Sequence, residues 1–149
     1  MYSFMLTTHN LLRWLILIVG AYALIRAISG VAGKRTFEAA DGNAGKLFTI
    51  SLDIQLLVGL LLYGIFSPVT RQAFADMGAA MAVREIRFFV AEHFLLMLLA
   101  VAAAHITSVL VRRAPTDDVK FKRMGAGVAI TLGLILGGMP WWRPMFPGM

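Results

Sequence analysis

The sequence predicts an all-α integral membrane protein, built as a four-helix bundle, and three observations predict this fold. Of the 149 residues, 59% are apolar and only 15% are charged, whereas a soluble domain is roughly 45–50% apolar and about 25% charged. The apolar residues gather in four runs, each long enough for a helix that crosses a hydrocarbon core of about 30 Å. These runs lack the alternation of apolar and polar residues that half-buried strands show.

The four runs occupy residues 6–28, 47–66, 86–111 and 124–142. Arg13 and Arg26 interrupt the first run and no basic segment precedes it, so we interpret it as a retained helix rather than a cleaved signal peptide. Polar connections follow the first and third runs, over residues 30–45 and 114–118. Pro68 ends the second run and Pro140 ends the fourth, because proline cannot continue a helix. We therefore expect one domain over residues 1–149, with an interfacial tail after the fourth run.

Orientation follows from the excess of Lys and Arg in cytoplasmic loops. The second connection and the tail are the less basic side, which predicts an up-down-up-down bundle with both termini outside. The net charge of +6 is therefore attributed to the loops and not to nucleic-acid binding. The more basic first and third connections contain Lys34, Arg35, Lys46, Arg112, Arg113, Lys120, Lys122 and Arg123, against Arg71, Arg84, Arg87 and Arg143 on the other side.

Two histidines are predicted to lie at the same depth in the bundle. His9 is on the first helix and His93 is on the third, and these two helices run in the same direction. At 1.5 Å per residue, both side chains lie roughly 9–12 Å below the outer entry point. Histidine within a spanning segment usually has a partner or a function. The pair is the arrangement that bis-histidine ligation of haem b needs, and the alternative is that each ring only forms a hydrogen bond between helices.

Polar and small residues around this pair fit a haem. Cations near the aqueous edge would neutralise anionic propionates, and glycines would let a flat macrocycle approach the helices. Arg13 can instead extend its charge to the headgroups. The Gly133-x-x-x-Gly137 pattern predicts close helix packing. The candidate cofactor-binding residues around the pair are Arg13, Gly20, Gln55, Gly59, Tyr63, Arg84 and Arg87, and His105 is a further candidate, for a quinone.

The third histidine is predicted to pair with an acid. His105 and Asp53 lie at similar distances from the cytoplasmic ends of their helices, so the spacing favours a His105–Asp53 contact. This contact is either a structural pair or part of a quinone site. Glu92 is expected to pair with Arg13, Arg84 or Arg87. Four imidazoles are needed for two bis-histidine haems and the chain has three, so one haem is the limit.

The chain resembles small bacterial four-helix membrane proteins of the cytochrome b-like type. The matching stretches are HNLLRW (residues 9–14), QLLVGLLLYG (55–64), RFFVAEHFLLMLLA (87–100) and PWWRP (140–144). The resemblance implies one haem b held by His9 and His93, electron transfer as the role, and a place in the bacterial inner membrane. The chain departs from di-haem four-helix cytochromes b in lacking the fourth histidine.

Other functions are left open or excluded. The chain has no cysteine, which excludes disulfides, thiolate metal sites and covalent c-type haem. Hydrolase and nucleotide-binding motifs are missing. The alternative function is an accessory subunit of a larger respiratory or photosynthetic membrane complex, and other membrane subunits or a second copy are the expected partners besides the lipid bilayer. A metal or proton transporter that uses His9, His93, Asp53 and Glu92 is the weakest alternative.

Overall fold

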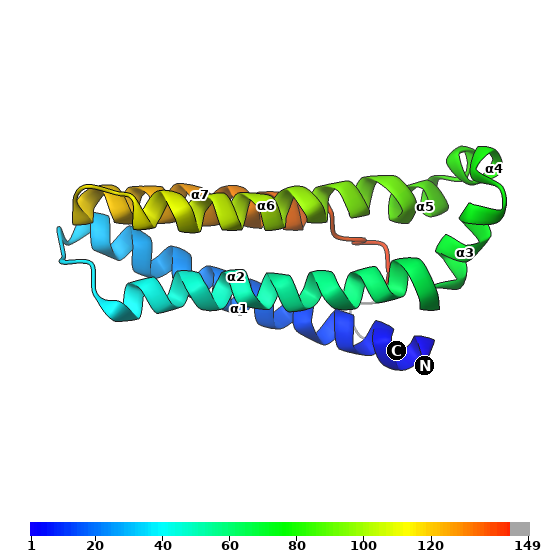
Figure 1. Ribbon diagram of the computed structural model, residues 1–149, viewed down its shortest axis with the longest axis horizontal. Coiled ribbons are helices and arrows are strands. Elements are labelled where there is room, and N and C mark those ends of the chain that lie inside the picture. The colour runs from blue at the N-terminus through cyan, green and yellow to red at the C-terminus, as the bar shows by residue number, and fades with distance from the viewer. Residues whose placement is uncertain (144–149) are drawn as a thin grey trace.

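The computed structural model describes residues 1–143, and within them the chain is helical with no strand (Figure 1). Four long helices run side by side: α1 (Tyr2–Ala32), α2 (Ala39–Leu61), α6 (His93–Arg112) and α7 (Asp117–Gly137). Shorter elements join α2 to α6 at one end of the molecule, the end where the N-terminus lies (Figure 1). In order, they are η1 (Leu62–Phe66), α3 (Pro68–Ala75), α4 (Met77–Ala82), α5 (Arg84–Arg87) and η2 (Phe88–Glu92).

The long helices pack in a closed order. α1 makes its main contacts with α2 and α7, and α6 makes its main contacts with the same two helices. α1 and α6 therefore lie diagonally opposite each other. Buried side chains fill the space between the four helices, with Ile16, Phe48, Met124 and Ile135 among the most enclosed. Any contact between α1 and α6 thus crosses the middle of the molecule.

Three segments are long and apolar enough to cross a membrane: residues 2–32, 39–66 and 84–112. Their outer faces are apolar, as in the exposed series Leu11, Ile18 and Ile25 along α1. Apolar residues on the outer face are typical of helices that contact lipid, where water provides no driving force for burial. These findings indicate a multi-pass membrane protein.

The fourth expected span differs from the prediction. α7 begins at Asp117 and ends at Gly137, so its uncharged part, residues 124–137, rises only about 21 Å. This length is short of the roughly 30 Å hydrocarbon core. The chain leaves the helix at Gly138, before Pro140, so the proline does not set the end. The outer part of the predicted tail, residues 144–149, lies outside the described residues.

Glycines on α7 do not pack as the sequence predicted. A Cβ at Gly133 or Gly137 would meet nothing within 4 Å among the described residues, so close packing of this pattern within the chain is wrong. Gly127 makes the close approach instead, since a Cβ there would collide with Thr107 of α6. The prediction was wrong because the face that α7 turns to α6 depends on how all the long helices pack and not on the glycine spacing.

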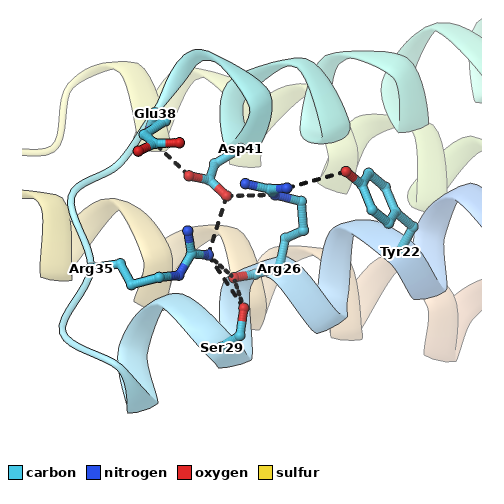
Figure 2. Close-up of polar contacts among 6 residues, drawn as sticks. All are labelled: Tyr22, Arg26, Ser29, Arg35, Glu38 and Asp41. Atoms are coloured by element: carbon cyan, nitrogen blue, oxygen red, sulfur yellow. Dashed lines mark hydrogen bonds and ion pairs between the residues drawn. The ribbon is translucent and has the colours of Figure 1, made fainter.

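The connection between α1 and α2 is shorter than expected, and a buried carboxylate fixes it (Figure 2). The Asp41 side chain is 0% exposed and accepts from Arg26 Nε at 2.7 Å and from Arg35 Nη2 at 3.5 Å. Its second oxygen accepts the backbone N–H of Glu38 at 3.0 Å, as part of a capping box at the start of α2. Arg26 also donates to Tyr22, and Arg35 donates to Ser29. The first turn of α2 is thereby tied to the last turns of α1.

Candidate functional site

His9 on α1 and His93 at the start of α6 meet across the middle of the molecule. Their ring centroids are 6.2 Å apart and the rings are inclined at 68°. Two imidazoles on opposite sides of one metal ion, with metal–nitrogen bonds of about 2 Å, have ring centroids about 6 Å apart. The two histidines that the spacing placed at one depth therefore lie together, at a separation that suits a shared metal.

A backbone carbonyl orients the ring of His93. Its Nδ1 lies 2.7 Å from the carbonyl oxygen of Gly138, which accepts a hydrogen bond from Nδ1–H. The ring proton is then on Nδ1, so the lone pair is on Nε2, which makes no hydrogen bond among residues 1–143. A metal-ligating histidine almost always donates its other ring N–H in this way. The site thus holds one imidazole in the tautomer that a metal ligand needs.

The second imidazole, His9, is held by α2. Gln55 Nε2 donates to the His9 carbonyl oxygen at 3.0 Å. His9 Nδ1 and Gln55 Oε1 are both buried, and neither has a hydrogen-bond partner within the described part of the chain. A ring N–H and an amide oxygen are complementary groups. Buried polar atoms without partners are uncommon and mark a place where a further group or a small rearrangement completes the site.

The predicted stripe on α2 continues beside the histidines. A Cβ at Gly59 would lie 3.3 Å from Cε1 of His9, so the glycine leaves room for that ring. Tyr63 in η1 donates its hydroxyl hydrogen to the carbonyl oxygen of Val90 in η2 at 2.9 Å and stacks on Phe94 at 4.5 Å. Gln55 and Gly59 therefore contact His9, whereas Tyr63 fixes the segment that leads into His93.

Two cavities flank the histidine pair. One has a volume of about 220 Å³ and the other about 60 Å³, and both are lined mainly by apolar atoms. His9 and His93 line both, together with Leu52, Gln55 and Met97. The rings therefore stand between two apolar spaces, which is the environment that a flat, largely apolar macrocycle on a bis-histidine iron requires.

Two arginines line the larger cavity. Arg13 is only 8% exposed, and its guanidinium lies 5.7 Å from the Trp14 ring centroid. This burial favours the predicted cavity position over an extended side chain at the headgroups. Arg143 lies over the Phe89 ring at 4.4 Å. The two cations give the larger cavity a positive side, which would suit carboxylate groups.

Arg143 was not predicted as a site residue, because its charge counted only toward orientation. The signal was present: helices rarely continue through Gly138 and Pro140, so the chain that follows α7 can turn back over the helices. Phe89 and Met139 also line the cavity and were not predicted. They reach it from η2 and from the residues after α7.

Three predicted cofactor-binding residues are not brought to the cavities. Gly20 faces Phe48 and Leu132, whose atoms would lie 2.7 and 2.8 Å from an added Cβ, so it is a packing residue. Arg84 is exposed and lines neither cavity. Arg87 pairs with Glu92 at 3.0 Å, which is one of the partners expected for that acid.

A π-helical segment, η2 (Phe88–Glu92), leads into His93 and separates it from Arg87. Its hydrogen bonds run from residue i to i+5, wider than in an α-helix. The two arginines were predicted from their depth alone, and at 3.6 residues per turn neither lies on the face of His93. Segments of this kind often occur at functional sites. Here η2 places Phe88 and Phe89 against His93, at 5.9 and 6.0 Å between ring centroids.

The predicted pair of His105 and Asp53 is confirmed. His105 Nε2 lies 2.8 Å from Asp53 Oδ1. One turn away, Thr49 and Ser108 share a hydroxyl hydrogen bond at 3.2 Å. Both contacts join α2 to α6. His105 lines neither of the two cavities beside His9 and His93, so it is separate from that site.

Comparisons with protein-family models, curated proteins and solved structures find no match. The resemblance to cytochrome b-like proteins therefore stays a prediction. Within residues 1–143, no three or more His, Cys, Asp or Glu side chains lie together as a metal-ion site. An iron held in a macrocycle needs only two imidazoles from the protein.

Gly59 provides a test of the close contact between α2 and His9. We expect Gly59→Val to displace the His9 ring, because even the first carbon of the new side chain would lie 3.3 Å from it. For the haem that the resemblance implies, the content after purification should fall at least threefold. Gly133→Val is the matched control, since nothing lies within 4 Å of a Cβ there. Equal haem content in the two variants, measured by absorbance per chain, would contradict the contact.

Proposed function

We propose that this chain is a membrane-bound b-type cytochrome that holds one haem b between His9 and His93 and relays electrons. In this proposal α1, α2, α6 and α7 form a four-helix transmembrane bundle in the bacterial inner membrane. Both termini and the histidine pair lie toward the outer face, as the distribution of Lys and Arg predicts. The short apolar part of α7 is accommodated because its flanking Lys and Arg side chains can extend to the interface.

One observation carries the proposal. Two imidazoles from diagonally opposite helices stand 6.2 Å apart between apolar cavities. The Nδ1–H of His93 is donated to the Gly138 carbonyl, which leaves Nε2 as the ligand atom. A histidine pair that only joined helices would donate from one ring to the other or to the backbone on both sides. Here His93 donates to the backbone from Nδ1, and the buried Nδ1 of His9 has no partner among the described residues.

Each residue of the site would have a separate role. His9 and His93 would hold the haem iron, and the haem would supply one-electron redox chemistry. Arg13 and Arg143 would balance the charge of the propionates. Leu52, Met97 and the aromatic residues of η2 would exclude water and keep the dielectric constant low, which would tune the potential. Because two protein side chains would bind the iron, the role that we assign to the haem is electron transfer and not the binding of a gas or a substrate.

The proposal is tested on the purified wild-type chain, expressed with ample haem. We expect one haem b per chain and a reduced-minus-oxidised spectrum with the sharp α and Soret bands of paired imidazoles. A folded, monodisperse protein without a Soret band would reject the proposal. Stoichiometric co-purification of a haem-free chain with respiratory or photosynthetic subunits would support the accessory-subunit alternative instead.

A further inference from the structure

A groove of about 800 Å³ lies among α2, α6 and α7, apart from the histidine pair described above. Its walls are mainly apolar, with Val109, Met124 and Val128 among the residues that line it. His105 and Asp53 also line it, and they are the deepest ionisable groups along α6 and α2 in this half of the molecule. The groove thus has mainly apolar walls, and His105 and Asp53 form an ionisable pair within it.

This ionisable pair faces the surroundings rather than the core. The side chain of His105 is 55% exposed and that of Asp53 is 40% exposed. Both residues are in segments that are long and apolar enough to span a membrane, and their neighbours Ile54 and Ile106 are exposed apolar residues. An ionisable pair at this depth is costly when it faces hydrocarbon and marks a functional site by default. A polar group of a ligand would form the hydrogen bonds that this pair needs in hydrocarbon.

The hydrogen bonding of the pair defines that ligand. His105 Nε2 is engaged by Asp53 Oδ1, and Nδ1 makes no hydrogen bond among the described residues. When the imidazole is neutral with its proton on Nε2, Nδ1 accepts a hydrogen bond from a hydroxyl group. When the imidazole is protonated, Nδ1–H donates to a carbonyl oxygen. A para-quinone offers the carbonyl, and its quinol offers the hydroxyl.

We propose that this groove binds a lipophilic quinone or its quinol, with the ring at His105 and the isoprenoid tail along the apolar walls. Depth favours this ligand over a phospholipid. His105 is seven residues before Arg112, about 10 Å below the end of α6, whereas a phosphate headgroup stays at the interface. The groove's cations Lys46, Arg112 and Lys120 lie toward that end and not beside His105.

The inference rests on the proposed function in one respect: a quinone here is an electron partner only if the chain holds a haem. His105 and His93 are about 18 Å apart along α6, so the two sites share one helix without overlapping. Binding of the quinone does not itself require the haem. The two proposals can therefore fail separately.

The test measures binding of decylubiquinone to the wild-type chain in phosphatidylcholine nanodiscs, by calorimetry, with and without haem. We expect saturable binding of one molecule per chain. His105→Phe and Asp53→Asn should each raise the dissociation constant at least tenfold and leave the haem spectrum unchanged. Asp118→Asn is the matched control, because Asp118 pairs with Lys122 on an exposed face and lines no part of the groove.

Three outcomes are decisive. Weakened binding in His105→Phe, or in Asp53→Asn if the former does not fold, supports the site. Identical, unsaturable uptake in all variants means partition into lipid and overturns it. Saturable binding that phosphatidylglycerol displaces and that neither variant weakens assigns the groove to a phospholipid and also overturns it. A wild-type chain that binds no haem but binds quinone through His105 would refute only the proposed function.

Discussion

Replacing either His9 or His93 by Ala is expected to abolish haem binding. The two imidazoles lie 6.2 Å apart between their ring centroids, and Met97 is the only methionine among residues 1–143 that lines both cavities. Loss of either imidazole would remove one of the two residues that hold the haem and would widen the apolar cavity, so the haem should be released during purification. We expect at least a tenfold fall in haem per chain, measured by pyridine haemochrome absorbance.

The third histidine is the control for this result. His105→Phe removes an imidazole from the same helix as His93 but from outside both cavities. Its haem content should equal that of the wild-type chain. If His105→Phe lost the haem as completely as His93→Ala, or if His9→Ala retained an unchanged spectrum, the ligand assignment would be wrong. Circular dichroism of each variant checks that the helices persist.

Asp41→Asn is expected to lower the free energy of unfolding by about 2 kcal/mol. Removing one partner of a buried ion pair costs roughly 3–5 kcal/mol because a charge is left uncompensated. Here the side chains of Arg26 and Arg35 are 23% and 35% exposed and can reach water, so we expect a smaller loss. Asparagine keeps an oxygen for the Glu38 backbone N–H (Figure 2), so the variant isolates the charge.

Unfolding by denaturant in mild detergent measures this loss. Asp118→Asn is again the matched control, since its pair with Lys122 is exposed, with 55% and 61% of the two side chains accessible. An exposed pair contributes only about 0–1 kcal/mol. Equal midpoints for Asp41→Asn and Asp118→Asn would mean that the buried carboxylate does not hold the α1–α2 connection.

Helical geometry was sufficient to predict which side chains on two parallel or antiparallel helices lie at the same depth. The rise per residue placed His9 level with His93, and the rings meet. It also placed Asp53 level with His105, and those side chains are hydrogen bonded. Depth depends only on residue count along each helix, so a sequence specifies it well.

Direction around a helix was harder to predict. Depth alone placed Arg87 near His93, but its side chain pairs with Glu92, and residue count along a helix does not specify such a choice. The prediction that Gly20 contacts a cofactor was wrong for a different reason. The side chains that surround it, Phe48 and Leu132, come from α2 and α7, so its role depends on how three helices pack. Arg143 reaches the cavity because the chain turns after α7, a local path that periodicity does not encode.

The measurement that tests the central claim most directly is low-temperature electron paramagnetic resonance of the oxidised wild-type protein. Two imidazoles on one ferric iron predict a low-spin signal typical of bis-histidine ligation, with no high-spin component. The same signal should be lost in His9→Ala and retained in His105→Phe. A high-spin signal, or a low-spin signal that survives the loss of His9 or His93, would contradict the claim that these two side chains share one iron.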